Sequence, residues 1–199
     1  MEATASMRSL AVAAATAVML AVGQFGVAAA QADSGSVDRL VELLAERIAT
    51  ADTVAAVKWE GAARGGGEPV IDDPVREQAI YDAMGQLGAE RNLPAQLVRQ
   101  VFQGQIEASK IVQRGLVTEW RYGLASAPVP ATDLSGIRPA IDGLNVAIID
   151  ELSSERIELT RSDCPALVAA AVLGVAGSNH LDALHSAALV RASTPLCTS

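Results

Sequence analysis

The sequence has few aromatic residues and no cluster of basic ones. Phe, Trp and Tyr together make up 3% of the 199 residues, and the formal net charge is −8. A surface that binds nucleic acid needs clustered Lys and Arg, so this composition argues against such a partner, although a few local cations suffice for a small anion. Few aromatics and abundant Ala suit close-packed helices better than a sheet.

The motifs of common catalytic sites are also missing. The triple glycine at 65–67 lacks the Lys-Ser/Thr of a P-loop and follows a helical pattern. No Gly-x-Ser-x-Gly supports a Ser-His-Asp site. His180 and His185 are five residues apart, off the four-residue step that places two imidazoles on one helical face. We therefore expect neither a bound metal nor a covalent nucleophile.

The first 32 residues have the pattern of an export signal. Arg8 precedes an apolar run from Leu10 to Ala30, and Ala30-Gln31-Ala32 resembles a cleavage site. The run is also about 20 residues long, enough to span a membrane, but its N-terminal position and its small-residue end favour cleavage. We predict an exported chain, periplasmic or secreted, with residues 33–199 as one domain and no membrane association after cleavage.

Cys164 and Cys197 are the only cysteines. In an exported chain an isolated pair most simply forms a disulfide, and the absence of Cys-x-x-Cys argues against redox chemistry. Closing a loop of about 34 residues adds about 3–4 kcal/mol in the chain-entropy model.

Apolar residues recur at helical spacing along the mature chain, without β alternation or internal repeats. This pattern predicts an all-α bundle of about six helices. Ser36 is expected to cap the first helix, and Asp73, followed by Pro74, to cap the second, which should bury Ile80, Ala83 and Leu87. The predicted helices cover residues 36–60, 74–92, 94–122, 134–155 and two shorter stretches within 164–190, with loops at 61–69 and 125–131.

Two cations lie on the apolar face of the first predicted helix. Arg47 and Lys58 are eleven residues apart, which at 3.6 residues per turn returns them to one face within roughly 20°. Leu40 and Leu44 share that face. An uncompensated charge in a dry interior costs several kcal/mol. A protein carboxylate or an anionic ligand must therefore meet these side chains.

Polar residues also fall on the inward faces of the other predicted helices. Three neutral side chains spaced by four, Gln105, Ser109 and Gln113, follow one another along the third helix. Arg76 on the second helix and Arg138 on the fourth align with apolar positions. The bundle can thus direct cations and neutral donors at one cavity, a combination that suits binding of a dianion or a reaction driven by electrostatic stabilisation.

The same residues allow interpretations without catalysis. Arg47 could pair with a carboxylate such as Glu46 or Asp142, and the three neutral side chains could form an interhelical network, as in a structural or interaction protein. Arginines near helix ends often lie at the surface. The cavity could also belong to an exported helical protein that binds a small aromatic or carboxylate metabolite without turnover.

Four runs of sequence carry a family resemblance. They are Ala45-Glu46-Arg47, Val54-Ala55-Ala56-Val57-Lys58-Trp59, Ile71-Asp72-Asp73-Pro74-Val75-Arg76-Glu77 and Val101-Phe102-Gln103-Gly104-Gln105-Ile106-Glu107-Ala108-Ser109-Lys110-Ile111-Val112-Gln113. In order and spacing they resemble the exported all-helical chorismate mutases of the AroQ gamma subclass. The resemblance covers nearly all of the mature chain, with catalytic helices at about 36–155 and disulfide-linked helices at 160–199.

The resemblance implies the rearrangement of chorismate to prephenate, a pericyclic step that needs no metal, cofactor or covalent intermediate. By similarity, Arg47 and Arg138 bind substrate carboxylates, Arg76 belongs to the same cationic ring, and Ser109 adds a hydrogen bond. Lys58 and Gln113 donate to the ether oxygen, where negative charge grows. Glu77 accepts from the substrate hydroxyl, while Asp73 caps the second helix and orients Arg76.

Four further points follow from the resemblance. Some exported relatives have Glu in place of Gln113, and a Glu must be protonated to donate, whereas Gln donates at any pH. Minimal relatives take one cation from a partner subunit, a role that Arg138 could fill within one chain. Exported relatives suggest a homodimer. The connector at 61–69 is longer than the family leads us to expect.

Overall fold

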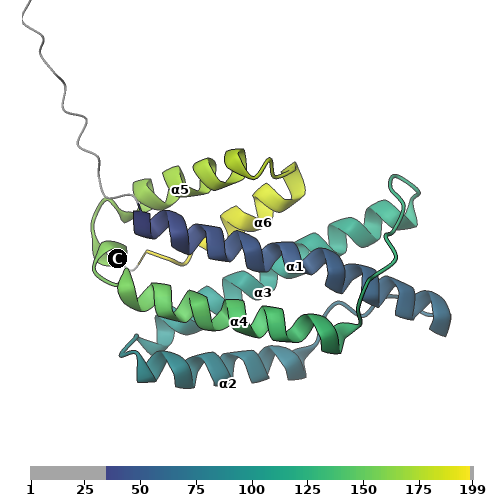
Figure 1. Cartoon of the computed structure of the whole chain (residues 1–199), viewed down its shortest axis with the longest axis horizontal. Coiled ribbons are helices and arrows are strands. Elements are labelled where there is room, and N and C mark those ends of the chain that lie inside the picture. The colour runs from purple at the N-terminus through teal and green to yellow at the C-terminus, as the bar shows by residue number, and fades with distance from the viewer. Residues whose placement is uncertain (1–34, 198–199) are drawn as a thin grey trace, which may run out of the picture. The chain divides into compact units, whose positions relative to one another are not determined.

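Helices form all the regular secondary structure that is described. The computed structural model describes residues 35–197, and within them the chain forms six α-helices, one short 3-10 helix and no strand (Figure 1). The predicted all-α class is confirmed, whereas the predicted export signal, residues 1–32, lies outside the described residues. None of the described helices has the length and apolar character needed to cross a membrane. The elements are α1 (Gly35–Gly65), α2 (Pro74–Glu90), α3 (Ala95–Arg121), α4 (Leu134–Ser154), η1 (Glu158–Thr160), α5 (Cys164–Ser178) and α6 (Ala183–Ser193).

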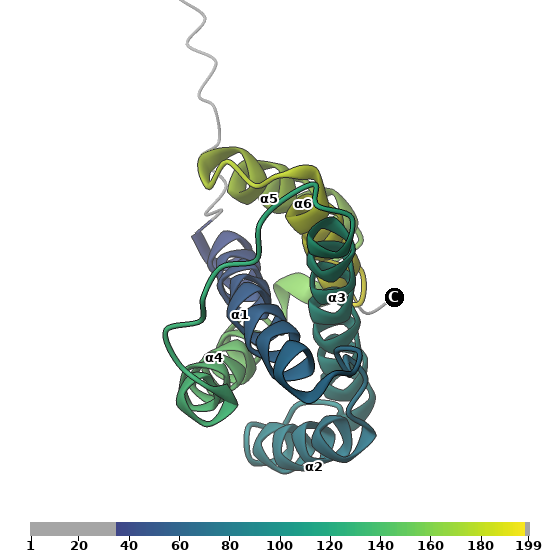
Figure 2. The ribbon, with the colours of Figure 1, turned by 90° about the vertical axis from the view of Figure 1, so that its right-hand side faces the viewer.

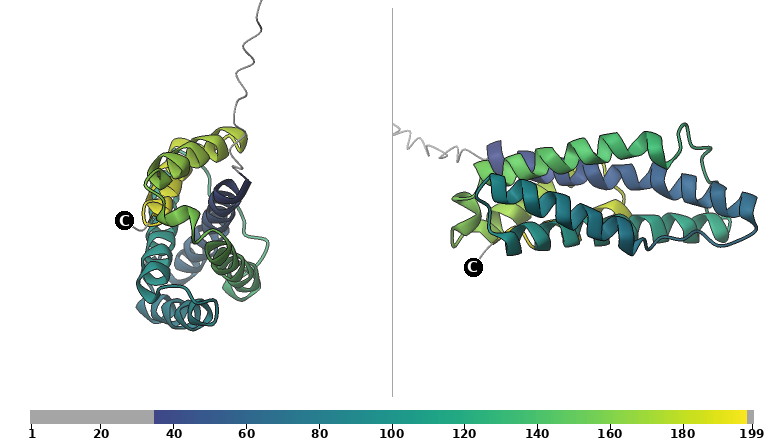
Figure 3. Two further views of the ribbon diagram at one scale, coloured as in Figure 1. Left: turned by 90° about the vertical axis from the view of Figure 1, so that its left-hand side faces the viewer. Right: turned by 90° about the horizontal axis from the view of Figure 1, so that it is seen from below.

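Helix α1 lies at the centre of the bundle. Helices α3 and α4 pack along it, α5 and α6 cover another side, and α2 packs against α3 and α4 (Figure 2). The four longer helices, α1 to α4, run lengthwise beside one another (Figure 3). Aliphatic residues dominate the core, as the scarcity of aromatics in the sequence indicates. The large side chains that are fully buried include Leu40, Leu44, Phe102, Ile148, Ile149, Leu152 and Leu189.

Asp73 caps α2 as predicted. Its side chain accepts a hydrogen bond from the backbone N–H of Arg76 at 3.0 Å, and Pro74 occupies the first helical position. Asp133 caps α4 in the same way, through the N–H of Gly136 at 2.9 Å. These two caps fix where the chain enters the helices that carry Arg76 and Arg138.

Helix α1 is longer than predicted. The sequence predicts a loop over residues 61–69, but the helix continues to Gly65, since the Ala-rich stretch before it favours helix. The helix ends where Gly66 adopts a φ of +69° and the N–H of Gly67 donates to the carbonyl of Ala62 at 3.1 Å. This is the Schellman pattern, which glycine accommodates without strain. The connector to α2 is correspondingly shorter than predicted.

Two smaller expectations about helix positions are wrong. Ser36 lies inside α1 rather than at its N-cap. Ala83 is exposed, and α2 instead buries Met84 and Gly88. The reason is close packing of α2 on α3, because a Cβ atom added at Gly88 would lie 2.6 Å from Cγ2 of Val98. Ile80, Met84 and Gly88 are four residues apart, so the buried face of α2 runs along them and Ala83 lies beside it.

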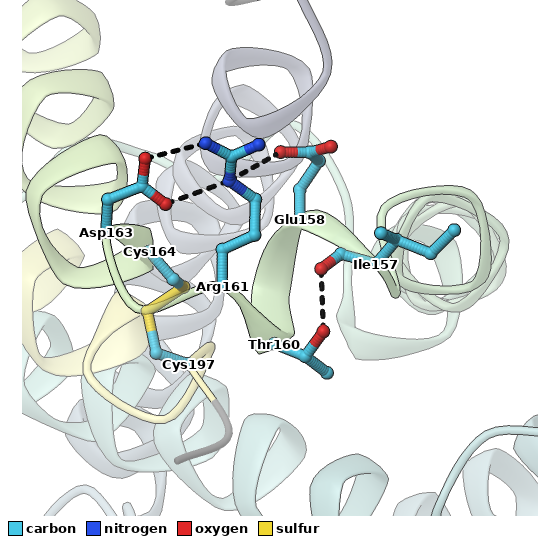
Figure 4. The surroundings of a disulfide bond; sticks show 7 residues. All are labelled: Ile157, Glu158, Thr160, Arg161, Asp163, Cys164 and Cys197. Atoms are coloured by element: carbon cyan, nitrogen blue, oxygen red, sulfur yellow. Dashed lines mark hydrogen bonds and ion pairs between the residues drawn. A yellow bond between two sulfur atoms is a disulfide. The ribbon is translucent and has the colours of Figure 1, made fainter.

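The predicted disulfide is present. Cys164, the first residue of α5, is bonded to Cys197, which follows α6, and their Cα atoms are 5.9 Å apart. Beside it, Arg161 forms ion pairs with Glu158 and Asp163 (Figure 4). The disulfide therefore links the start of α5 to the segment that follows α6.

His185 links α6 to α1 and should make stability depend on pH. Its Nδ1 lies 2.8 Å from Asp182, the N-cap of α6, and its Nε2 lies 2.9 Å from Asp52 of α1. Carboxylates only accept, so both contacts are hydrogen bonds only when the imidazole is protonated on both nitrogens. Burial lowers the pKa of His185, but the two aspartates outweigh burial and raise the pKa above its ordinary value.

The stabilisation by His185 should be complete below the unfolded pKa of about 6.5 and should be lost as pH rises through the raised folded pKa. Because both aspartates are largely exposed, we expect a loss of about 1 kcal/mol or less. Urea unfolding of the wild type and His185→Gln at pH 6 and pH 8.5 measures it, with His180→Asn as the control, since His180 is exposed with a φ of +51° that Asn tolerates. An equal pH slope in wild type and His185→Gln would contradict the prediction.

Candidate active site

The eight residues that the sequence predicts for catalysis and substrate binding line one cavity. It lies among α1, α2, α3 and α4 and has a volume of about 690 Å³, counted with the open space at its mouth. The eight residues are Arg47, Lys58, Asp73, Arg76, Glu77, Ser109, Gln113 and Arg138, and the apolar walls include Val54, Ile71, Ile80, Ile106, Leu134, Ile137 and Ile141.

Arg47 is a buried cation with neutral hydrogen-bond partners. Arg47 is 4% exposed. Its Nε donates to Oδ1 of Asn145 on α4 at 2.6 Å, and its Nη1 donates to Oε1 of Gln105 on α3 at 3.4 Å. Burial, followed by repulsion from Arg76, lowers the pKa of Arg47 to about 10, against the opposing effect of Asp142. The charge of Arg47 is thus held at the cavity wall by amides.

No carboxylate of the described residues forms an ion pair with Arg47. Glu46 pairs with Arg39 at 3.0 Å, and Asp142 pairs with Arg76 at 2.7 Å. The structural interpretation, in which Glu46 or Asp142 neutralises Arg47 directly, therefore does not hold. The position next to Arg47 in the cavity is open to an anionic ligand.

Arg76 and Arg138 approach from the starts of α2 and α4. Arg76 is half-buried, whereas Arg138 is exposed. Asp142 accepts from Nη2 of Arg76 at 2.7 Å, while Asp73 accepts from the backbone N–H of Arg76. Asp142, rather than Asp73 as predicted, therefore orients the guanidinium of Arg76.

Lys58 reaches the cavity from the third turn of α1 beyond Arg47. Its ammonium donates to the backbone carbonyl of Ile71 at 2.8 Å. Burial lowers the pKa of Lys58, and the carboxylates of Asp73 and Asp72 oppose this shift. An ammonium has three donors, so a ligand can take up those that Ile71 does not use.

Gln113 and Ser109 lie one turn apart on α3. Nε2 of Gln113 donates to Oγ of Ser109 at 3.0 Å, and Gln113 is 5% exposed. Its Oε1 is buried and has no hydrogen-bond partner among the described residues. A buried amide oxygen without a partner costs about 1–3 kcal/mol. Oε1 of Gln113 can gain a partner in two ways, from a ligand in the cavity or by rotation of the amide.

Lys110 also lines the cavity, and the sequence analysis missed it. It is 9% exposed, and its Nζ lies 2.9 Å from Glu77, 3.0 Å from Glu107 and 3.2 Å from Asp72. Burial lowers its pKa, but the bonds to the three carboxylates outweigh burial and raise the pKa above its ordinary value. The one signal in the sequence is Glu107, three residues earlier on the same helix.

The lining as a whole offers five cations, a hydroxyl, an amide and two carboxylates on apolar walls. Cations of this kind bind a small dianion. Donors held by a rigid scaffold also stabilise negative charge that develops on a bound molecule, because they need no reorganisation as the charge forms. The fold and the cavity thus define an all-helical protein with a preorganised site for a small anionic substrate.

Comparison with known proteins agrees with this description. The family described as chorismate mutase type II matches residues 37–114. The chain is 31% identical over 177 residues to the secreted chorismate mutase of Mycobacterium tuberculosis, covering 88% of this chain and 86% of that protein. It is 34% identical to the secreted chorismate mutase of Mycolicibacterium smegmatis, covering 92% and 98%. A crystal structure of chorismate mutase from Burkholderia phymatum superposes with a TM-score of 0.77 at 35% identity, covering 83% and 98%.

The chain belongs to the type II chorismate mutase family. Members of this family are enzymes that rearrange chorismate to prephenate, and this chain is one of them.

Proposed function

We propose that the cationic cavity catalyses the rearrangement by holding chorismate in its reactive shape and by stabilising charge on the breaking ether bond. The observation that carries the proposal is the convergence of Arg47, Lys58, Arg76 and Arg138 on one cavity from three helices. Arg47 and Arg138 bind the two carboxylates, with Arg76 beside them. Holding a flexible dicarboxylate in a chair-like conformation removes much of the entropic part of the barrier.

Lys58 and Gln113 act on the ether oxygen. As the C–O bond breaks and the new C–C bond forms, negative charge grows on that oxygen, and two donors stabilise it. Lys58 needs only to redirect an N–H toward the substrate. The Ser109 hydroxyl can donate as well as accept, so a 180° turn of the Gln113 amide satisfies its orphaned Oε1 and frees both Nε2 hydrogens for the cavity.

Glu77 accepts a hydrogen bond from the substrate hydroxyl. It lines the cavity from the first turn of α2, and the cap formed by Asp73 fixes that turn. Asp73 contributes by holding the start of the helix and, since it also lines the cavity, by contacting the substrate.

The site needs no residue of a second chain in this proposal, because Arg138 comes from the same chain as the other cations. The resemblance to exported chorismate mutases supports a homodimer. In such a dimer each cavity would work by itself, and dissociation would leave the chemical step intact.

The protein is exported in this proposal. The two curated relatives are named secreted chorismate mutases, and residues 1–32 have the pattern of a cleavable signal. The mature protein then consists of residues 33–199, with catalytic helices over about 36–155 and disulfide-linked helices over 160–199.

The disappearance of chorismate absorbance tests the proposed function. Purified, oxidised protein without residues 1–32 should accelerate the reaction on the order of 10⁶-fold over the uncatalysed rate. Adding a chelator should leave the rate unchanged, since no step uses a metal. Correctly folded protein that binds chorismate but does not consume it would overturn the catalytic proposal in favour of a binding protein.

A further inference from the structure

Lys110 joins three segments of the chain at the wall of the cavity. It lies on α3, and its Nζ contacts Glu77 on α2, Asp72 in the connector before α2, and Glu107 one turn earlier on α3. Lys110 and Glu77 line the cavity, whereas Asp72 and Glu107 do not. One ammonium thus ties a cavity carboxylate to two carboxylates outside it.

The two bonds to Glu77 engage the same oxygen. Oε1 of Glu77 lies 2.9 Å from Nζ of Lys110, and it also accepts from the backbone N–H of Asp73 at 3.3 Å. Oε2 of Glu77 accepts no hydrogen bond from any residue in the described part of the chain. Two contacts at Oε1 hold that oxygen in place, and the second oxygen stays available as an acceptor.

The contact between Lys110 and Glu77 also affects the charge in the cavity. A bound dianion would be repelled by an isolated carboxylate in a partly dry cavity. The ammonium at 2.9 Å offsets the charge of Glu77 locally. The burial of Lys110, with only 9% of its surface exposed, keeps water from screening the pair.

We propose that Lys110 is a positioning residue that fixes Glu77 through Oε1 and so presents Oε2 to the hydroxyl of the substrate. This inference rests on the proposed function of Glu77 as the acceptor for that hydroxyl. Lys110 itself does not touch the substrate, so its contribution passes through Glu77.

A double-mutant cycle in the purified enzyme separates the two residues. Lys110→Met and Glu77→Gln should each lower kcat/KM for chorismate on the order of 10-fold, as expected for loss of a hydrogen bond to a charged group. Lys110→Met introduced into Glu77→Gln should lower it by less than about twofold further, because the residue through which Lys110 acts is then gone. Lys110→Arg should restore most of the activity, since it still pairs with a carboxylate.

Glu107→Gln is the matched control. It removes another carboxylate partner of Lys110 without changing the cavity lining and should leave kcat/KM unchanged. Thermal unfolding of every variant shows whether it is folded, and Lys110→Gln replaces Lys110→Met in the cycle if the latter does not fold.

The outcomes distinguish the two proposals. Unchanged kcat/KM in Glu77→Gln would refute the proposed role of Glu77. A clear loss in Glu77→Gln with none in Lys110→Met would leave that role standing and overturn the positioning by Lys110. Losses that multiply in the double variant would also overturn it, because Lys110 would then act independently of Glu77.

Discussion

Lys58→Met should lower kcat for chorismate by about 10²-fold or more, because the variant loses a charged donor to the ether oxygen. The charge on that oxygen develops only in the transition state, so kcat should fall more than KM rises. Met keeps an unbranched side chain of similar length, which preserves packing beside the partly buried Val54 and Ile71. Steady-state kinetics over a range of chorismate concentrations measures both parameters.

Arg64→Met is the control for Lys58. Arg64 lies further along the same helix, its side chain is 68% exposed and it pairs with Glu60. Its replacement should change kcat by less than about twofold, as for other exposed ion pairs. Wild-type kcat in Lys58→Met, together with a lower unfolding temperature, would contradict the prediction. Lys58 would then serve only to hold the carbonyl of Ile71.

The start of α2 could be predicted because it depends on neighbouring residues. Asp73 followed by Pro74 supplies both a side-chain acceptor and a suitable backbone, and the observed cap matches it. The end of α1 could not be predicted as well. The stretch from Gly61 to Gly67 contains several glycines, and the local sequence does not decide which of them takes the left-handed conformation. Gly66 does so.

The inward direction of the cations could be predicted, but not their partners. Spacing along a helix determines which face a residue occupies, and this suffices to bring Arg47 to the cavity. Its partners Gln105 and Asn145 are 58 and 98 residues away in sequence, and only the packing of α3 and α4 brings them together. Lys110 was missed for the same reason. Beside charged neighbours on its helix it resembles an exposed residue, and the approach of α2 buries it.

Arg47 lowers the stability of the fold and at the same time serves substrate binding. A buried cation bonded to two neutral amides is not compensated by any carboxylate contact among the described residues. Such a charge costs several kcal/mol to bury. The lowered pKa, about 10, expresses the same cost. A bound substrate carboxylate would supply the missing charge, so binding should relieve a penalty that folding imposes.

Arg47→Met should therefore lower kcat/KM by about 10²-fold or more, with much of the loss in KM, because the carboxylate is present in the bound ground state as well as in the transition state. Stability should change far less. Removing the buried charge is favourable, while Asn145 and Gln105 each lose a donor at a cost of about 1–3 kcal/mol. Kinetics and urea unfolding measure the two effects separately. Prephenate should raise the unfolding temperature of the wild type and not that of the variant.

Arg39→Met is the matched control, since Arg39 lies two turns earlier on α1, with a side chain 47% exposed and paired with Glu42 and Glu46. It should keep wild-type kcat/KM and the stabilisation by prephenate. An Arg47→Met variant with unchanged kcat/KM would contradict the prediction, whatever its free energy of unfolding. If Arg47→Met loses activity but prephenate still raises its unfolding temperature, Arg47 stabilises the transition state and does not contribute to binding of the ground state. Only joint loss of activity and of prephenate stabilisation supports a substrate carboxylate as the anion that Arg47 binds.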